Sequence, residues 1–252
     1  MIPELSAYWQ GSFNRYVEPF CGSATLFFKL APTSAILGDI NAELIETYSQ
    51  VRKSPLSIAE TLKKLRKGRT RYLELRALDP GKMDPAMRAA RFIYLNRYCF
   101  NGLYRTNLAG RFNVPYGGDR SGNLPSLQEL EACASLLQRA KLIAGGFEKT
   151  LNMVKRGDFV YMDPPFNVRS KRVFREYNPS AFGSATLEIL RQWLERLDRL
   201  GATFLVSYAE SDEANALAKS FNTKLVTVKR NISGFVEGRV AANELLITNR
   251  AS

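Results

Sequence analysis

The four residues Asp163-Pro164-Pro165-Phe166 combine a carboxylate, two prolines and an aromatic ring at the end of the apolar run that starts at Phe159. Proline has no backbone N–H and a fixed φ, so this turn presents carbonyl oxygens in a rigid arrangement. Acceptors beside a flat ring are suited to hold the exocyclic amino group of a planar base while the ring stacks on it. The alternative is a rigid loop in an unrelated enzyme. The position after a strand favours the base-binding interpretation, because ligands of open α/β sheets bind at that edge.

Two earlier strand-like runs also end in a carboxylate. Residues 15–20 contain Glu18 and lead into the small residues 21–25 and a helix over 26–30. Residues 34–39 end in Asp39 and precede a helix over 41–52. A strand, a turn, a helix and a second strand ending in an acid form the first half of a parallel α/β sheet.

The same pattern returns after Lys141. Hydrophobic periodicity predicts strands over 159–163 and 203–207, helices over 187–200 and 212–220, and a closing strand pair over 224–230 and 244–248. The region between these halves is different. Residues 55–142 are mostly helical, with a buried helix over 88–98 and another helix over 127–137. Asn-Gly, Gly and Pro punctuation over 100–118 predicts a β-hairpin with long loops.

The amino-acid composition excludes several kinds of chemistry. The chain has 252 residues, of which 45% are hydrophobic, which is typical of a globular protein. It contains no histidine, which excludes histidine-based acid–base catalysis, Ser-His-Asp triads and most zinc sites, so we expect no metal. The three cysteines are odd in number and widely spaced, which excludes a disulfide framework and favours a reducing cytoplasm. The sequence shows neither a membrane-spanning apolar run nor a secretory signal.

The net charge points to a polyanionic partner. There are 36 Lys plus Arg against 24 Asp plus Glu, which gives +12 and a pI near 9.7. One basic cluster lies between Arg52 and Arg76, and another comprises Arg169, Lys171, Arg172 and Arg175. Solvated helix faces would explain either cluster alone, whereas both together with the net charge favour nucleic acid over a membrane surface.

Together these segments resemble the Dam-type (D12 class) DNA adenine-N6 methyltransferases, which depend on S-adenosylmethionine. The resemblance rests on residues 17–24, Asp39 with Asn41, 101–117 and 163–166, in the family's order, and extends to 229–233 and 244–249. It implies an α/β fold with a Rossmann-like class I methyltransferase sheet, formed by residues 1–54 and 141–252. Residues 55–140 would be an inserted, mostly helical DNA-recognition domain that carries the hairpin.

The resemblance also implies roles for residues of the cofactor site. The turn after the first strand would cradle the methionine part of S-adenosylmethionine, Asp39 would bind the ribose hydroxyls, and Phe147 would stack on the cofactor. The implied cofactor residues are Glu18, Pro19, Phe20, Cys21, Gly22, Ser23, Ala24, Asp39, Asn41, Phe147 and Asp163.

The implied catalytic residues are Asp163, Pro164, Pro165 and Phe166. Asp163 and the Pro164 carbonyl would accept hydrogen bonds from the amino group of a flipped-out adenine, and Phe166 would stack on the base. The reaction would be a direct in-line methyl transfer without a covalent enzyme intermediate.

The implied partner is double-stranded DNA. Phe100 and Asn101 would lie at the disrupted base stack, and Arg105 is the best candidate for a guanine contact. Other implied DNA-binding residues are Leu103, Asn113, Pro115, Arg169, Lys171, Arg172 and Arg175. The family's commonest target, GATC, is the first expectation for the site.

Three departures from the family pattern stand out. The Lys-Trp-x-Gly-Gly-Lys-like segment ahead of the first strand has no match before Tyr16. The family's Asp-Phe pair, whose Asp binds the amino group of the cofactor adenine, corresponds here to Gly146-Phe147. Phe166 replaces the more usual Tyr.

The first two departures keep an alternative open, a catalytically weakened or inactive DNA-binding relative. A methyltransferase acting on cytosine amino groups, RNA or a protein amide is a further alternative. We expect a cytoplasmic, bacterial or phage-encoded enzyme, a monomer without an obligate protein partner. A solitary enzyme and a member of a restriction-modification system are both open alternatives.

Overall fold

The computed structural model describes residues 1–107, 109–118, 122–165, 184–229 and 241–250. These residues divide into two compact units. Unit 1 comprises the described parts of 1–40, 139–169 and 180–252, and unit 2 comprises those of 41–138. In the part of the chain described here, no helix is both long enough and apolar enough to cross a membrane.

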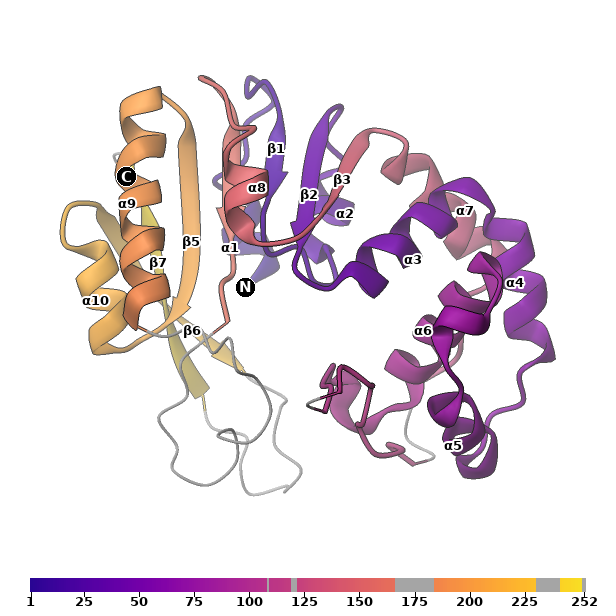
Figure 1. Cartoon of the computed structure of the whole chain (residues 1–252). Coiled ribbons are helices and arrows are strands. Elements are labelled where there is room, and N and C mark those ends of the chain that lie inside the picture. The colour runs from indigo at the N-terminus through magenta and orange to yellow at the C-terminus, as the bar shows by residue number, and fades with distance from the viewer. Residues whose placement is uncertain (108, 119–121, 166–183, 230–240, 251–252) are drawn as a thin grey trace. The chain divides into compact units, whose positions relative to one another are not determined.

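Unit 1 is built on a seven-stranded sheet (Figure 1). Its strand order is β3-β2-β1-β4-β5-β7-β6, with β1 to β5 parallel and the β6–β7 pair antiparallel. The strands are β1 (Tyr16–Glu18), β2 (Ala35–Asp39), β3 (Ala140–Ala144), β4 (Phe159–Met162), β5 (Thr203–Ala209), β6 (Asn222–Lys229) and β7 (Ala241–Thr248). The predicted mixed α/β fold with a mostly parallel sheet is confirmed, and this order is consistent with a Rossmann-like methyltransferase.

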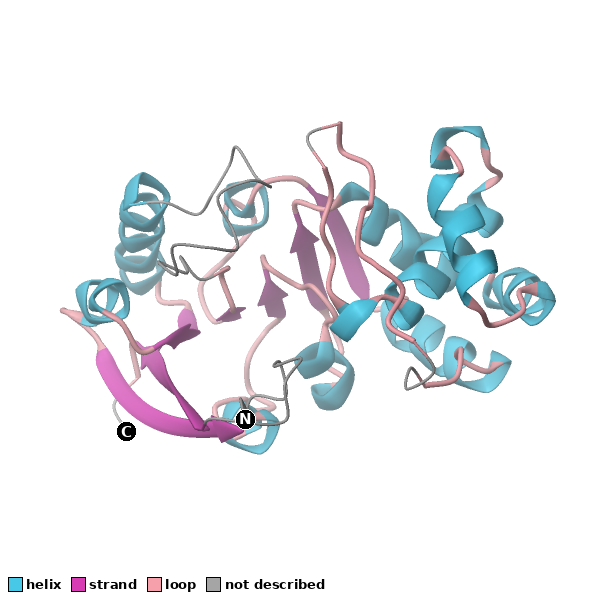
Figure 2. Ribbon diagram, turned by 90° about the horizontal axis from the view of Figure 1, so that it is seen from below, coloured by secondary structure: helices cyan, strands magenta, loops and turns pink. Residues whose placement is uncertain are grey.

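Both faces of the sheet are buried, which explains the nearly continuous apolar sequence of its central strands. On one face, Val17 and Val160 belong to a core with the helices α8 (Phe147–Leu151), α9 (Ser184–Leu200) and α10 (Asp212–Ala218). On the other face, the rings of Tyr16 and Phe159 pack around Trp9 and Phe27, next to α1 (Ile2–Ser6) and α2 (Thr25–Leu30). Figure 2 shows the strands with helices along both sides of the sheet.

Gly38 in β2 allows α8 to pack closely on the sheet. A Cβ atom at position 38 would lie 2.0 Å from the Thr150 Oγ1 atom, and Thr150 is fully buried. We therefore expect Gly38→Ala to lower the free energy of unfolding by about 1–3 kcal/mol through overpacking. Urea unfolding measures this, with Gly11→Ala as the control because nothing lies within 4 Å of a Cβ at position 11. Equal losses in both variants would contradict the account.

Unit 2 is helical. Its helices are α3 (Ala42–Lys53), α4 (Pro55–Lys64), α5 (Arg69–Ala77), α6 (Pro85–Tyr98) and α7 (Leu127–Leu137), with the short 3₁₀ turns η1 (Pro80–Lys82) and η2 (Phe100–Gly102). Arg91 of α6 is buried, pairs with Glu43 of α3 at 3.1 Å and donates to the Leu75 carbonyl at 2.8 Å. Because α3 also packs on α6 and α7, unit 2 begins at residue 41, whereas we expected the insertion to begin at residue 55.

The segment expected as a β-hairpin contains no strand among its described residues. It is closed by two isolated antiparallel bridges, Cys99–Tyr116 and Thr106–Phe112. The turn η2 interrupts the ladder, because Asn101 and Gly102 adopt φ values of 53° and 64°. Tyr72 and Arg76 of α5 donate to the Val114 carbonyl, which holds the segment on unit 2.

Candidate active site

Three carboxylates come from the carboxyl ends of neighbouring strands of unit 1. β1 pairs with β2 on one side and with β4 on the other, so that Glu18 lies opposite Leu37 and Val17 opposite Val160. Asp39 ends β2, and Asp163 follows directly after β4. The order 3-2-1-4-5 reverses between β1 and β4, and ligands of open α/β sheets bind at such a switch point. The sequence-predicted acids therefore lie at the edge where a ligand is expected.

The turn after β1 is fixed to the end of β2. The Gly22 N–H donates to the Asp39 carboxylate at 2.9 Å, and the Cys21 N–H donates to the Gly38 carbonyl at 2.8 Å. Gly22 and Ala24 have positive φ values of 45° and 49°, which a left-handed turn requires. Pro19, Cys21 and Ala24 are buried and Phe20 is half-buried, whereas Ser23 is exposed.

Several backbone N–H groups of this turn are already used within the protein, which limits the groups that could bind a cofactor. The Cys21, Gly22 and Ala24 N–H groups already donate to oxygens of the protein. The exposed hydroxyls of Ser23 and Thr25, 2.8 Å apart, are side-chain groups that the turn still presents.

The Glu18 carboxylate at this edge has a strongly raised pKa. It is buried, and its Oε2 atom has no hydrogen-bond partner among the described residues. Burial raises the pKa of Glu18 well above its usual value, and the nearby Asp163 and Asp39 carboxylates raise this pKa further, although the Tyr16 hydroxyl opposes the rise. Crowded carboxylates of this kind favour a bound cation or an amino group that donates to them.

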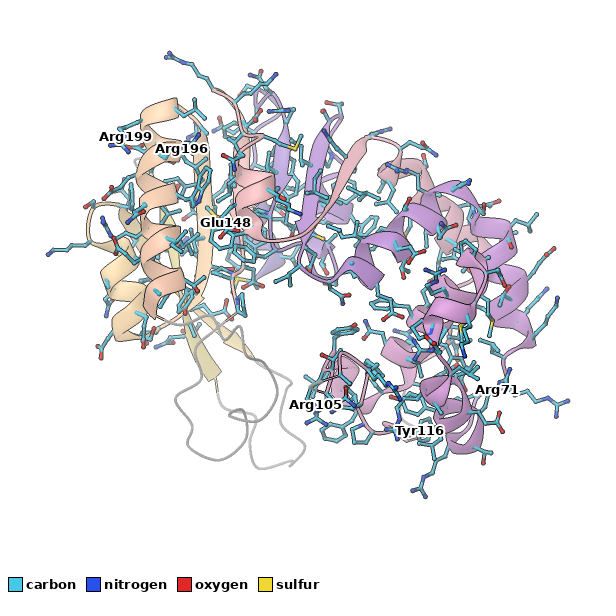
Figure 3. The ribbon with its side chains drawn as sticks, in the orientation of Figure 1. Arg71, Arg105, Tyr116, Glu148, Arg196 and Arg199 are labelled. Atoms are coloured by element: carbon cyan, nitrogen blue, oxygen red, sulfur yellow. The ribbon has the colours of Figure 1, made fainter. Side chains whose placement is uncertain are left out.

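Sequence reasoning missed two features near this edge, one at the start of α8 and one directly after β2. Gly146 is the N-cap of α8, and a Cβ atom at this position would lie 2.5 Å from the Glu148 Oε2 atom. The Glu148 carboxylate therefore lies where the side chain of residue 146 would be. Figure 3 labels Glu148 on α8. Ile40, next to Asp39, is 73% exposed and offers an apolar surface. An apolar residue directly after the acid that ends a strand is the sequence feature that could have predicted this surface.

Two of the expected cofactor residues, Phe147 and Asn41, belong to different units of the structure. The Phe147 ring is buried in unit 1 and stacks on the Phe20 ring at a centroid distance of 5.2 Å. Asn41 belongs to unit 2, where its side chain accepts from the Leu44 N–H and caps α3. Their contacts with a cofactor stay predictions.

Asp163 is exposed, and a hydroxyl of the neighbouring strand donates to its carboxylate. Its Oδ1 atom accepts from the Ser207 hydroxyl at 3.2 Å, and the Ser207 Oγ atom lies 2.9 Å from the Tyr161 hydroxyl. Pro164 is buried and Pro165 is exposed. Phe166, Arg169, Lys171, Arg172 and Arg175 lie outside the described residues.

The predicted DNA-binding residues of the 99–118 segment belong to unit 2. Phe100, Asn101, Leu103 and Pro115 are exposed. Arg105 is half-buried, and its Nε atom donates to the Asn113 side-chain oxygen at 2.8 Å. Arg105 and Tyr116 come from this segment, and Arg71 comes from α5 (Figure 3).

Comparisons with known proteins identify the family. The sequence model of the D12 class N6 adenine-specific DNA methyltransferases matches residues 2–232. A type II methyltransferase of Lactococcus lactis subsp. cremoris is 33% identical over 258 residues, covering 99% of this chain and 91% of the relative. A type II methyltransferase of Methanocaldococcus jannaschii is 32% identical, with 95% and 90% covered, and a DNA adenine methylase of Vibrio cholerae is 30% identical, with 91% and 85% covered. The chain therefore belongs to the D12 class N6 adenine-specific DNA methyltransferases.

Proposed function

We propose that this protein transfers a methyl group from S-adenosylmethionine to the N6 amino group of an adenine in duplex DNA, at the sheet edge between β1 and β4. The observation that carries the proposal is the placement of Asp163, followed by two prolines, beside the carboxylates of Glu18 and Asp39. Family membership supplies the reaction class.

The residues at this edge fit the cofactor. S-adenosylmethionine bears hydroxyl groups, an amino group, an adenine amino group and a positively charged sulfonium, and when bound it supplies an electrophilic methyl group. The buried Glu18 carboxylate, whose neighbours are also acidic, favours a cationic ligand. Asp39 would accept from the ribose hydroxyls, and Ile40 would cover one face of the adenine ring.

Asp163 would act on the target base. Its carboxylate and the Pro164 carbonyl would accept the two hydrogens of the adenine amino group, which directs the nitrogen lone pair toward the cofactor methyl. A base within the duplex stack cannot reach such a site, so the nucleotide must flip out. Phe166 would stack on the flipped base.

Unit 2 would bind the duplex around the target. The exposed Phe100 and Asn101 side chains would lie at the disrupted stack, and Arg105 would read a guanine in the major groove. For the target we propose a GATC-like site. The net charge of +12 supports phosphate contacts as the main source of affinity.

Cofactor binding by the full chain tests this proposal. We expect calorimetry to detect S-adenosylmethionine binding at tens of micromolar or better, at the latest once a duplex containing GATC is added. If DNA binds while the cofactor does not bind up to millimolar concentration, the proposal fails and the chain is a DNA-binding relative.

Glu148 is expected to bind the adenine amino group of the cofactor in place of the family's Asp at position 146. Glu148→Ala should lower cofactor affinity about tenfold, because one charge-assisted hydrogen bond is lost. The double variant Gly146→Asp with Glu148→Ala should restore the affinity, since Asp is also a favourable N-cap for α8. Calorimetry of both variants measures this. An unchanged affinity in Glu148→Ala, or no recovery in the double variant, would contradict the assignment.

Arg105 is expected to give sequence discrimination rather than general affinity. Arg105→Ala should reduce the preference for the target duplex over a duplex with one altered base pair by about tenfold or more. Arg111→Ala is the matched control, an exposed arginine of the same segment that should weaken both duplexes equally. Fluorescence anisotropy at fixed salt measures the ratio, and equal behaviour of the two variants would contradict the prediction.

A further inference from the structure

We infer that Ser207, supported by Tyr161, is a positioning residue that holds the Asp163 carboxylate in the orientation needed to accept from the target amino group. The inference rests on the proposed function and adds two residues to it. Both lie on the central strands of the sheet, Tyr161 in β4 and Ser207 in β5, and both are buried.

The direction of the hydrogen bonds follows from the groups themselves. An ionised carboxylate only accepts, so the 3.2 Å contact requires the Ser207 hydroxyl to donate its single hydrogen to the Asp163 Oδ1 atom. The Ser207 oxygen must then accept from the Tyr161 hydroxyl in the 2.9 Å contact. Burial raises the pKa of Tyr161, and the Asp163 carboxylate raises it further, which keeps this phenol protonated as the first donor of the chain.

The strand register explains why these three residues meet. β4 and β5 are parallel, with Tyr161 opposite Leu205 and Met162 opposite Val206, so that Asp163 and Ser207 are the next positions along the two strands. Tyr161 and Asp163 are two residues apart, which places them on one side of β4. The donors are therefore fixed by the sheet.

The donor is more deeply buried than the acceptor. Asp163 is exposed and follows the end of β4, whereas Ser207 is 1% exposed within β5. A misplaced acceptor lowers the rate of an oriented reaction strongly. The donated hydrogen also stabilises the ionised carboxylate over the protonated acid, which could not accept both amino hydrogens equally well.

Other titratable groups surround this chain of hydroxyls. Glu18 of β1 interacts with Asp163 and Tyr161, and Glu244 of β7 interacts with Tyr161. Ser207→Ala and Tyr161→Phe both keep these carboxylates in the protein. A shift of the acidic limb that both variants share, and that a variant with another buried hydroxyl removed lacks, therefore reports on the Asp163 carboxylate and its donors.

The test is the pH profile of kcat/KM for methyl transfer to a duplex oligonucleotide. We expect Ser207→Ala to lower kcat at neutral pH about tenfold and to shift the acidic limb upward by about half a pH unit or more, because the carboxylate loses a donor. Tyr161→Phe should shift the limb in the same direction by less. Ser207→Thr, which keeps the hydroxyl, should restore the wild-type limb. Cofactor affinity should stay within about twofold in all three variants.

Thr248→Val is the matched control, because the Thr248 hydroxyl is buried and donates to the Phe204 carbonyl rather than to Asp163. It should leave the acidic limb unmoved. If Ser207→Ala shows the wild-type limb and kcat, or if Thr248→Val shifts the limb equally, the inference is overturned. A wild-type protein without methyl transfer would instead overturn the proposed function.

Discussion

Replacing Asp163 by alanine is expected to reduce kcat for methyl transfer about 10³-fold. The carboxylate is the acceptor that orients the target amino group, and removing one preorganised hydrogen-bonding group of this kind typically costs 10²- to 10³-fold. Its loss should leave folding intact, because the Asp163 side chain is exposed. Transfer of labelled methyl groups to a duplex under single-turnover conditions measures the effect.

Two further variants test this prediction, Asp163→Asn at the same position and Asp212→Asn as a control. The amide at position 163 keeps one acceptor oxygen and adds donors that face the amino group, so its rate should lie between wild type and Asp163→Ala. Asp212 is an exposed carboxylate of α10 with the same charge, and Asp212→Asn should retain the wild-type rate. A rate within threefold of wild type for Asp163→Ala would exclude its catalytic role.

The second large effect is expected for Asp39. Asp39→Ala should weaken S-adenosylmethionine binding about 10- to 100-fold, which corresponds to the loss of a hydrogen bond to a charged group. The substitution removes an acceptor for the ribose and also the partner of the Gly22 N–H, which fixes the turn after β1. Calorimetry with the cofactor alone measures the change.

Asp39→Asn separates these two contributions. The amide oxygen can still accept from Gly22, so the turn should keep its position while the charged contact with the ribose is lost. We expect an affinity between those of wild type and Asp39→Ala. Wild-type affinity in both variants would show that the ribose is bound elsewhere.

Most of the sheet could be predicted from the sequence because its strands are short apolar runs that end in an acid or a polar residue. The strands ending near Glu18, Asp39 and Asp163 were all expected, and they bring these acids to one edge. β3 was not expected, since Ala140–Ala144 lies at the edge of the sheet and is only partly buried. The boundary of unit 2 also escaped prediction, because the packing of α3 depends on the long-range pair of Glu43 and Arg91.

The sequence predicted the motifs of the site but not the residues that support them. Gly146 suggested a missing carboxylate, and only the fold places the Glu148 side chain over that position. Ser207 is one polar residue at the end of an apolar strand, and its contact with Asp163 depends on the register of β4 and β5. Neither relationship is local in sequence, so periodicity and spacing could not reveal it.

The most direct test of the account is to incubate the purified chain with S-adenosylmethionine and unmethylated duplex DNA and then identify the modified nucleoside by mass spectrometry. The account predicts N6-methyladenine in the wild-type reaction and its loss in Asp163→Ala. A modified cytosine would contradict the assignment of the target base. An unmodified duplex, under conditions in which the protein binds both DNA and cofactor, would contradict the assignment of Asp163 and its neighbours as a methyl-transfer site.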